Sequence, residues 1–152
     1  TPTKSSAASD VYKRQELAGM KILQFAFDGN LDNPYLPENI KEENWIVYTG
    51  THDNSTSLGW WREMDQGRKE QLRERIFDYE NFTSWELIRI GMETKAKLFV
   101  APMQDLLNLD DSCRLNKPGT TENNWSWRLP RNDLNIRDSL KKYGDLAKAN
   151  KR

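Results

Sequence analysis

The stretch WIVYTGTHDN, residues 45–54, joins an apolar run directly to a polar loop, a pattern from which the fold class can be inferred. The run WIVYTG (45–50) is rich in aromatic and β-branched residues, which favours a short strand. Two other runs have the same character, KILQFAF (21–27) and KLFVAPM (97–103). Short apolar runs between turn-forming residues are typical of buried strands, so we expect three of them.

Helical patterns alternate with these strands. The segment 55–79 is highly charged but keeps an apolar face, which predicts helix. The tetrad TSWE (83–86) predicts a capping box, in which Thr83 caps a helix and Glu86 reaches back to it. A last amphipathic helix is expected from about Asn135. This alternation indicates an α/β fold with a parallel sheet.

The composition excludes several classes of protein. The 23 basic residues balance the 23 acidic ones without forming a long block, which argues against nucleic acid or an anionic membrane surface as partner. One cysteine and one histidine cannot build a structural zinc site or an internal disulfide. No apolar run approaches the ~20 residues of a membrane span, and the first residues lack the apolar core of a secretion signal.

The first fifteen residues, TPTKSSAASDVYKRQ, differ from the rest of the chain. They are small and polar at the start and follow neither the strand nor the helix period. We therefore expect residues 1–15 to be a disordered or non-native lead-in, and residues 16–152 to be the globular portion.

The only histidine, His52, stands beside Asp53 where the second predicted strand ends. In parallel α/β folds, ligands gather at the carboxyl ends of the strands. A carboxylate and an imidazole among aromatic and amide side chains suit an uncharged ligand with many hydroxyl groups. A second interpretation stays open, since residues 53–56 (DNST) are also ordinary helix-capping types. The tryptophans at 60–61 and 125–127 likewise either pack in the core or line a site.

Four longer motifs carry a resemblance to a known family. They are GMKILQFAF (19–27), NPYLPENI (33–40), VYTGTHDNSTSLGWW (47–61) and APMQDLLNLDDSCRLNKPGTTENNWSWRL (101–129). In this order they resemble the C-terminal part of the 4-α-glucanotransferases, also called amylomaltases or disproportionating enzymes, which form glycoside hydrolase family 77. The similarity runs from about Glu16 to the end of the chain.

The resemblance implies a fold and a reaction. The fold is a (β/α)8 TIM barrel, of which the three predicted strands would be the sixth, seventh and eighth. The reaction is retaining transfer of α-1,4-glucan segments by double displacement. The reaction uses three carboxyl groups: an aspartate nucleophile, a glutamate acid/base and a third carboxylate. The third carboxylate stabilises the donor sugar as it flattens toward the oxocarbenium state.

Site residues follow from the resemblance position by position. The third carboxylate is Asp53, the transition-state stabiliser, and His52 beside it is a ligand of the donor sugar. Phe25 matches an aromatic residue near the acceptor side. Asn116, in the LNKPGT loop, matches a substrate-contacting asparagine. No metal ligand is implied.

The chain also departs from the family pattern. The nucleophile and the acid/base residue belong to the fourth and fifth strands, which would precede Gly19. Glu16 lacks the AEDLG-like surroundings of the acid. We therefore expect an inactive C-terminal fragment whose unpaired strand edges favour aggregation. Two alternatives are a non-catalytic carbohydrate-binding barrel fragment and an unrelated α/β domain in which the THDN tetrad (51–54) is only a cap.

Partners and location are implied as well. The expected ligands are maltooligosaccharides and α-1,4-glucans, with no cofactor, no nucleic acid and no membrane. The expected compartment is the cytoplasm, or a plastid if the source is a plant. The sequence assigns no oligomeric state. Gln104 and Asp105, just past the third strand, are either site-facing or structural.

Overall fold

A parallel three-stranded sheet organises the structure, a computed structural model that describes residues 17–130 and 135–152. The strands are β1 (Gly19–Ile22), β2 (Trp45–Tyr48) and β3 (Leu98–Val100), hydrogen-bonded in the order β1-β2-β3. The predicted parallel sheet is therefore confirmed. The prediction for residues 1–15 lies outside the described residues.

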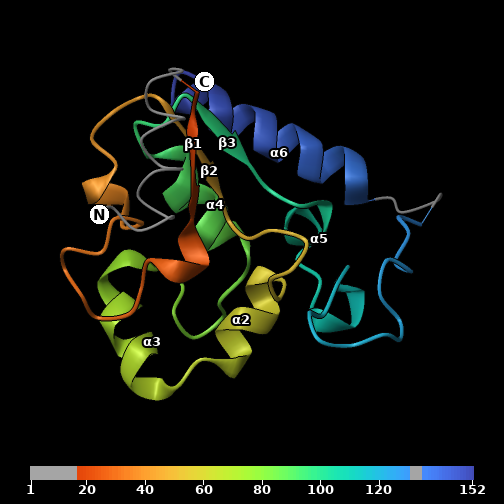
Figure 1. Cartoon of the computed structure of the whole chain (residues 1–152). Coiled ribbons are helices and arrows are strands. Elements are labelled where there is room, and N and C mark those ends of the chain that lie inside the picture. The colour runs from red at the N-terminus through yellow and green to blue at the C-terminus, as the bar shows by residue number, and fades with distance from the viewer. Residues whose placement is uncertain (1–16, 131–134) are drawn as a thin grey trace.

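Some helices lie beside the sheet, and others lie past the carboxyl ends of its strands (Figure 1). The α-helices are α2 (Ser57–Glu63), α3 (Gln66–Leu72), α4 (Trp85–Met92), α5 (Met103–Leu106) and α6 (Asn135–Ala149). Short 3-10 turns are η1 (Leu23–Phe25), η2 (Pro37–Asn39), η3 (Arg73–Arg75) and η4 (Asp111–Cys113). The last helix begins where the sequence predicted. Within the described ranges, no helix has the length and apolar character needed to cross a membrane.

One face of the sheet is covered by helices. Lys21, Val47 and Phe99 share a row across the three strands, so their side chains point to the same face. Val47 is fully buried there. The Phe99 ring packs on Gly91 of α4, where an added Cβ would lie 2.1 Å from a ring carbon. Tyr143 of α6 stacks on the same ring and donates a 3.2 Å hydrogen bond to the Phe99 carbonyl. These contacts fix α4 and α6 against β3.

The opposite face is partly open. Met20, Ile46 and Leu98 form the next row, and their side chains point to this second face. Met20 and Leu98 remain 53% and 50% exposed, which is unusual for large apolar residues in a central parallel sheet. The sheet therefore offers an apolar surface to further structure.

The strands are shorter than predicted. The chain leaves the strand conformation after Ile22 and turns through η1, where Ala26 N–H donates to the Leu23 carbonyl at 2.9 Å. KILQFAF is therefore mostly turn, with only its first two residues in β1. The third strand ends at Val100 because Pro102 lacks an N–H and stands before the first turn of α5.

The predicted capping box is wrong. Ser84, rather than Thr83, is the residue before α4, and no side chain caps that helix. The Ser84 hydroxyl instead donates to the Asp105 carbonyl at 2.5 Å. Glu86 accepts from the Phe77 N–H and pairs with Arg89, so its carboxylate serves the preceding loop. Tertiary partners thus displace the local cap.

Candidate functional site

The site lies at the carboxyl ends of the strands. The segments that leave β2 and β3 run toward α2 and α5 (Figure 1). The loop after β2 closes as a tight turn, in which Asn54 Oδ1 accepts from the N–H and the hydroxyl of Thr51 at 2.9 and 2.8 Å. Thr56 then caps α2, since its hydroxyl oxygen accepts from the Gly59 N–H at 3.1 Å. The capping interpretation of residues 53–56 is therefore confirmed at Thr56.

The turn leaves its histidine and aspartate at the surface. The side chains of His52 and Asp53 are 52% and 50% exposed, and His52 Nε2 lies 3.3 Å from Asp53 Oδ1. Asn116 reaches both residues from a distant loop. Its amide donates to Asp53 Oδ1 at 2.6 Å, and its backbone N–H donates to the His52 carbonyl at 3.1 Å. Three of the four residues expected from the sequence therefore meet at one place.

Phe25 is separate from that group. It ends η1, which follows β1, and its ring packs edge-on against Tyr35 at 5.8 Å between centroids. Phe25 is 48% exposed. Asn33 donates to the Phe25 carbonyl at 2.8 Å, which fixes the backbone at this position. Phe25 thus lies at the end of η1, and it forms no hydrogen bond or ring contact with His52 or Asp53.

Trp125 is the tryptophan that lies next to the histidine. Its ring centroid is 5.0 Å from that of His52, and the two planes are tilted by 41°. Its backbone has φ of 59°, a left-handed conformation that is strained for a large side chain. A 2.6 Å hydrogen bond from its N–H to the Leu115 carbonyl holds this conformation. By contrast, Trp61 is buried and stacks on Phe82 in the core.

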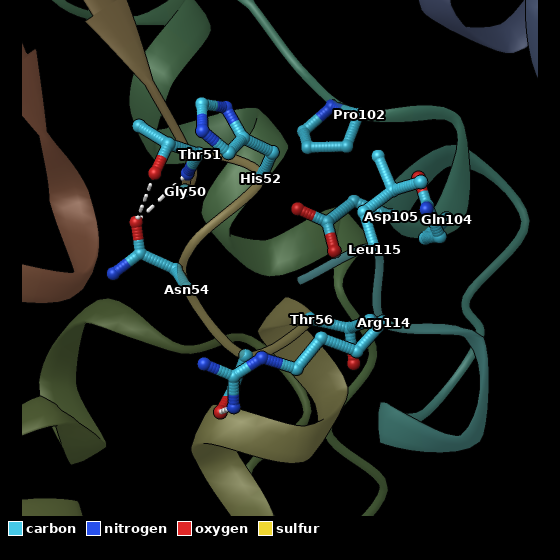
Figure 2. A pocket seen from close by; sticks show the side chains of 11 residues that line it. Gly50, Thr51, His52, Asn54, Thr56, Pro102, Gln104, Asp105, Arg114 and Leu115 are labelled. Atoms are coloured by element: carbon cyan, nitrogen blue, oxygen red, sulfur yellow. Dashed lines mark hydrogen bonds between the residues drawn. The ribbon is translucent and has the colours of Figure 1, made fainter. Parts of the chain in front are cut away.

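Beneath the loop lies a small cavity of about 50 Å³, shown in Figure 2. Thr51 and Asn54 bound one side, Pro102 and Asp105 the other, and Arg114 runs along the lower edge in this view. A space of this size holds water rather than a sugar. The residues that line this cavity therefore support the loop that carries the exposed side chains.

Asp105 is a buried residue of this lining and holds the loop in place through its carboxylate. It is 1% exposed, and Oδ2 accepts from the hydroxyls of Thr49 and Ser57 at 2.5 and 2.7 Å. Oδ1 accepts from the Ser57 N–H at 2.8 Å. Burial raises the pKa of the Asp105 carboxyl, although these hydrogen bonds act in the opposite direction. Asp105 thereby joins the end of β2 to the start of α2, and it is structural.

Sequence reasoning missed Arg114 and Asp111. Arg114 donates to the carbonyls of Asp53 and Asn116, and Asp111 accepts from the Thr56 N–H at 2.7 Å. Both lie in the irregular stretch after β3, where no period or spacing marks a residue as inward-facing. In the part of the chain that the structure describes, no three His, Cys, Asp or Glu side chains gather as a metal site.

Comparisons with known proteins give this arrangement a context. A family profile described as 4-alpha-glucanotransferase matches residues 3–134. A chloroplastic/amyloplastic 4-alpha-glucanotransferase of Arabidopsis thaliana is 41% identical over 138 residues, covering 84% of this chain and 24% of that protein. The 4-alpha-glucanotransferase of Thermus thermophilus is 43% identical over 120 residues, covering 74% of this chain and 24% of that protein.

A solved structure shares the fold. It is an amylomaltase from Streptococcus agalactiae in complex with acarbose, with a TM-score of 0.84 and 27% sequence identity. The match covers 97% of this chain and 30% of that one. The chain thus spans about a quarter of the length of the curated relatives it matches.

Proposed function

This chain belongs to the 4-alpha-glucanotransferase family, and from that premise we propose that it supplies the donor-sugar side of the active site of such an enzyme. The enzyme transfers α-1,4-glucan segments between maltooligosaccharides. One observation carries the proposal: Asp53, His52 and Asn116 converge past the carboxyl end of β2, where the His52 and Asp53 side chains are half-exposed to solvent. The relatives are named as transferases, which supports an enzyme over a carbohydrate-binding module.

The geometry suits recognition of sugar hydroxyls. His52 and Asn116 both approach Oδ1 of Asp53, which leaves Oδ2 for a hydroxyl of the donor sugar. The Trp125 ring beside His52 adds an exposed aromatic face on which a sugar can stack. The related amylomaltase structure holds acarbose, a carbohydrate, which supports this class of ligand.

Asp53 acts as the transition-state stabiliser in a retaining double displacement. As the donor sugar flattens, its hydrogen bonds to the carboxylate shorten and strengthen, so the contact lowers the barrier more than it stabilises bound substrate. Asp53 is neither the nucleophile that attacks the sugar nor the acid that protonates the leaving group. The nucleophile and the acid/base residue come from the fourth and fifth strands of the barrel, and their side chains face the same sugar.

The sheet belongs to a (β/α)8 barrel as its sixth to eighth strands. Parallel strands with helices on one face and a half-exposed apolar row on the other are the parts of a barrel wall. Met20, Ile46 and Leu98 form that row, and their side chains fill the barrel interior in the whole enzyme. The strand ends that carry the site then surround the mouth of the barrel.

The test uses the full-length enzyme that contains this segment. Incubation with maltotriose should give glucose and a ladder of longer maltooligosaccharides, separated by chromatography. Asp53→Asn keeps the size of the side chain and should lower kcat by at least ~10²-fold, the effect of losing one transition-state contact. A wild-type enzyme that only releases glucose, or an Asp53→Asn variant with normal turnover, contradicts the proposal.

A further inference from the structure

Arg114 occupies the junction between the two loops that carry the site. Nη2 donates to the Asp53 carbonyl at 2.7 Å, and Nε donates to the Asn116 carbonyl at 2.8 Å. Nη1 donates to the Ser55 hydroxyl at 3.1 Å and lies 3.6 Å from Asp111 Oδ2. The side chain is only 20% exposed. One planar group therefore binds four residues on both loops.

Side-chain hydrogen bonds other than those of Arg114 also join the loops, among them bonds from the Asn116 amide to Asp53 and from the Thr56 N–H to Asp111. Neither loop belongs to the sheet, and the Asn116 N–H to His52 carbonyl bond is the backbone bond that joins them directly. Arg114 adds two hydrogen bonds next to this one, to the carbonyls of Asp53 and Asn116. The guanidinium bonds at 2.7 and 2.8 Å have the length of charge-assisted hydrogen bonds, which are about twice as strong as neutral ones.

The same group also connects the site to the protein frame. Asp111, beside the guanidinium, accepts from the Thr56 N–H at the start of α2. Gly59 of α2 makes room for this carboxylate, since an added Cβ would lie 2.2 Å from Asp111 Oδ1. A displacement of Arg114 would therefore move both loops relative to α2.

We propose that Arg114 is a positioning residue for glucan transfer: it holds the backbone of Asp53 and Asn116 so that their side chains face one donor sugar. This inference rests on the proposed function. Arg114 acts through the two loops and does not touch the reacting atoms. Lysine cannot replace it, because an ammonium is a point donor on a flexible stem and cannot meet carbonyls on two loops in one plane.

The experiment measures kcat and KM for maltotriose in the full-length enzyme. Arg114→Lys and Arg114→Ala should both lower kcat by about 10²-fold while KM changes by less than about 3-fold, as expected when reacting groups are displaced by about 1 Å. Arg62→Ala is the matched control. Arg62 forms an exposed ion pair with Asp110 at 2.8 Å, and its loss should leave both constants within about 2-fold.

Chemical rescue separates positioning from general damage. Guanidinium ion at roughly tens of millimolar, far below denaturing concentrations, should raise the kcat of Arg114→Ala by about 10-fold, because it refills the planar donor site. Urea or sodium chloride at the same concentration should not raise the kcat of this variant. Should the alanine variant fail to fold, the lysine variant carries the test alone. A fully active, folded Arg114→Lys enzyme, or an Arg114→Ala enzyme indifferent to guanidinium, overturns the inference.

A crystal structure of Arg114→Lys gives a readout independent of activity. The hydrogen bond between Asn116 and Asp53 should be broken in this variant. An unchanged bond overturns the inference even if kcat falls. Inactivity of the wild-type enzyme on maltotriose would instead refute the proposed function. The two failures are therefore distinguishable.

Discussion

The side-chain amide of Asn116 donates a 2.6 Å hydrogen bond to the Asp53 carboxylate across 63 positions of sequence. The bond joins the loop after β2 to the irregular stretch after β3. It also fixes which carboxylate oxygen stays open to a ligand. A charge placed at Asn116 should therefore act directly on Asp53.

Asn116→Asp places a second carboxylate against Asp53. Two carboxylates at this distance repel when both are charged, and the pKa of one of them rises. In the full-length enzyme, turnover at pH 7 should fall by about 10²-fold, and more than in Asn116→Ala. The loss should shrink as pH falls to about 5, because a shared proton restores a hydrogen bond. The measurement is kcat against pH.

Asn81→Asp is the matched control, since Asn81 also donates to an exposed aspartate, Asp78, at 3.3 Å. This variant should keep the wild-type pH profile. An Asn116→Asp profile parallel to that of wild type would contradict a direct contact.

Asp105 should make stability depend on pH. Its pKa is raised by burial, so the folded chain holds the proton to higher pH than the unfolded chain does. Between the unfolded pKa and the raised native pKa, the folded state binds more protons, and the free energy of unfolding falls as pH rises. Asp105→Asn cannot titrate and should lack this decline in urea denaturation from about pH 4 to about pH 8.

Asp145→Asn provides a control of opposite sign. A hydrogen bond from Lys141 lowers the pKa of exposed Asp145, so its stabilising effect is present above the unfolded pKa and is lost as pH falls. Parallel stability curves for wild type and Asp105→Asn would refute the assignment to Asp105.

Gly59→Ala should destabilise the chain. The new methyl would lie 2.2 Å from Asp111 Oδ1, so the carboxylate must leave the Thr56 N–H. We expect the free energy of unfolding to fall by about 2 kcal/mol, measured by urea denaturation. Gly144→Ala in α6 is the control, because nothing lies within 4 Å of its added Cβ. That change should stabilise by about 0.5 kcal/mol. Equal effects at the two glycines would contradict the close contact.

The open face of the sheet should make the chain associate. We expect the mass measured by sedimentation to rise with protein concentration. Leu98→Lys puts a charge into the exposed apolar row and should reduce this rise. Leu140→Lys is matched in exposure, 49% against 50% for Leu98, but lies on α6. Association that is equally sensitive to both changes would locate the contact elsewhere.

Residue pattern alone predicted the order of elements and the parallel sheet, because apolar runs and helical periods are local properties. It also predicted that His52 and Asp53 would stand at a strand end. It failed at KILQFAF, where Gln24 N–H bonds the Thr49 carbonyl and η1 replaces the expected strand. It failed again at Ser84, whose hydroxyl binds the Asp105 carbonyl.

The family of this chain and the identity of three converging residues could be read from the amino-acid sequence, since long motifs in register are specific. The contacts that hold these three residues in place became visible in the folded chain. Arg114 and Trp125 lie in a stretch without period. Arg114 donates to the Asp53 carbonyl across 61 positions of sequence, and the Trp125 ring lies against His52 of the other loop. Hydrogen bonds of that range depend on where folded loops meet, and no local pattern encodes that meeting.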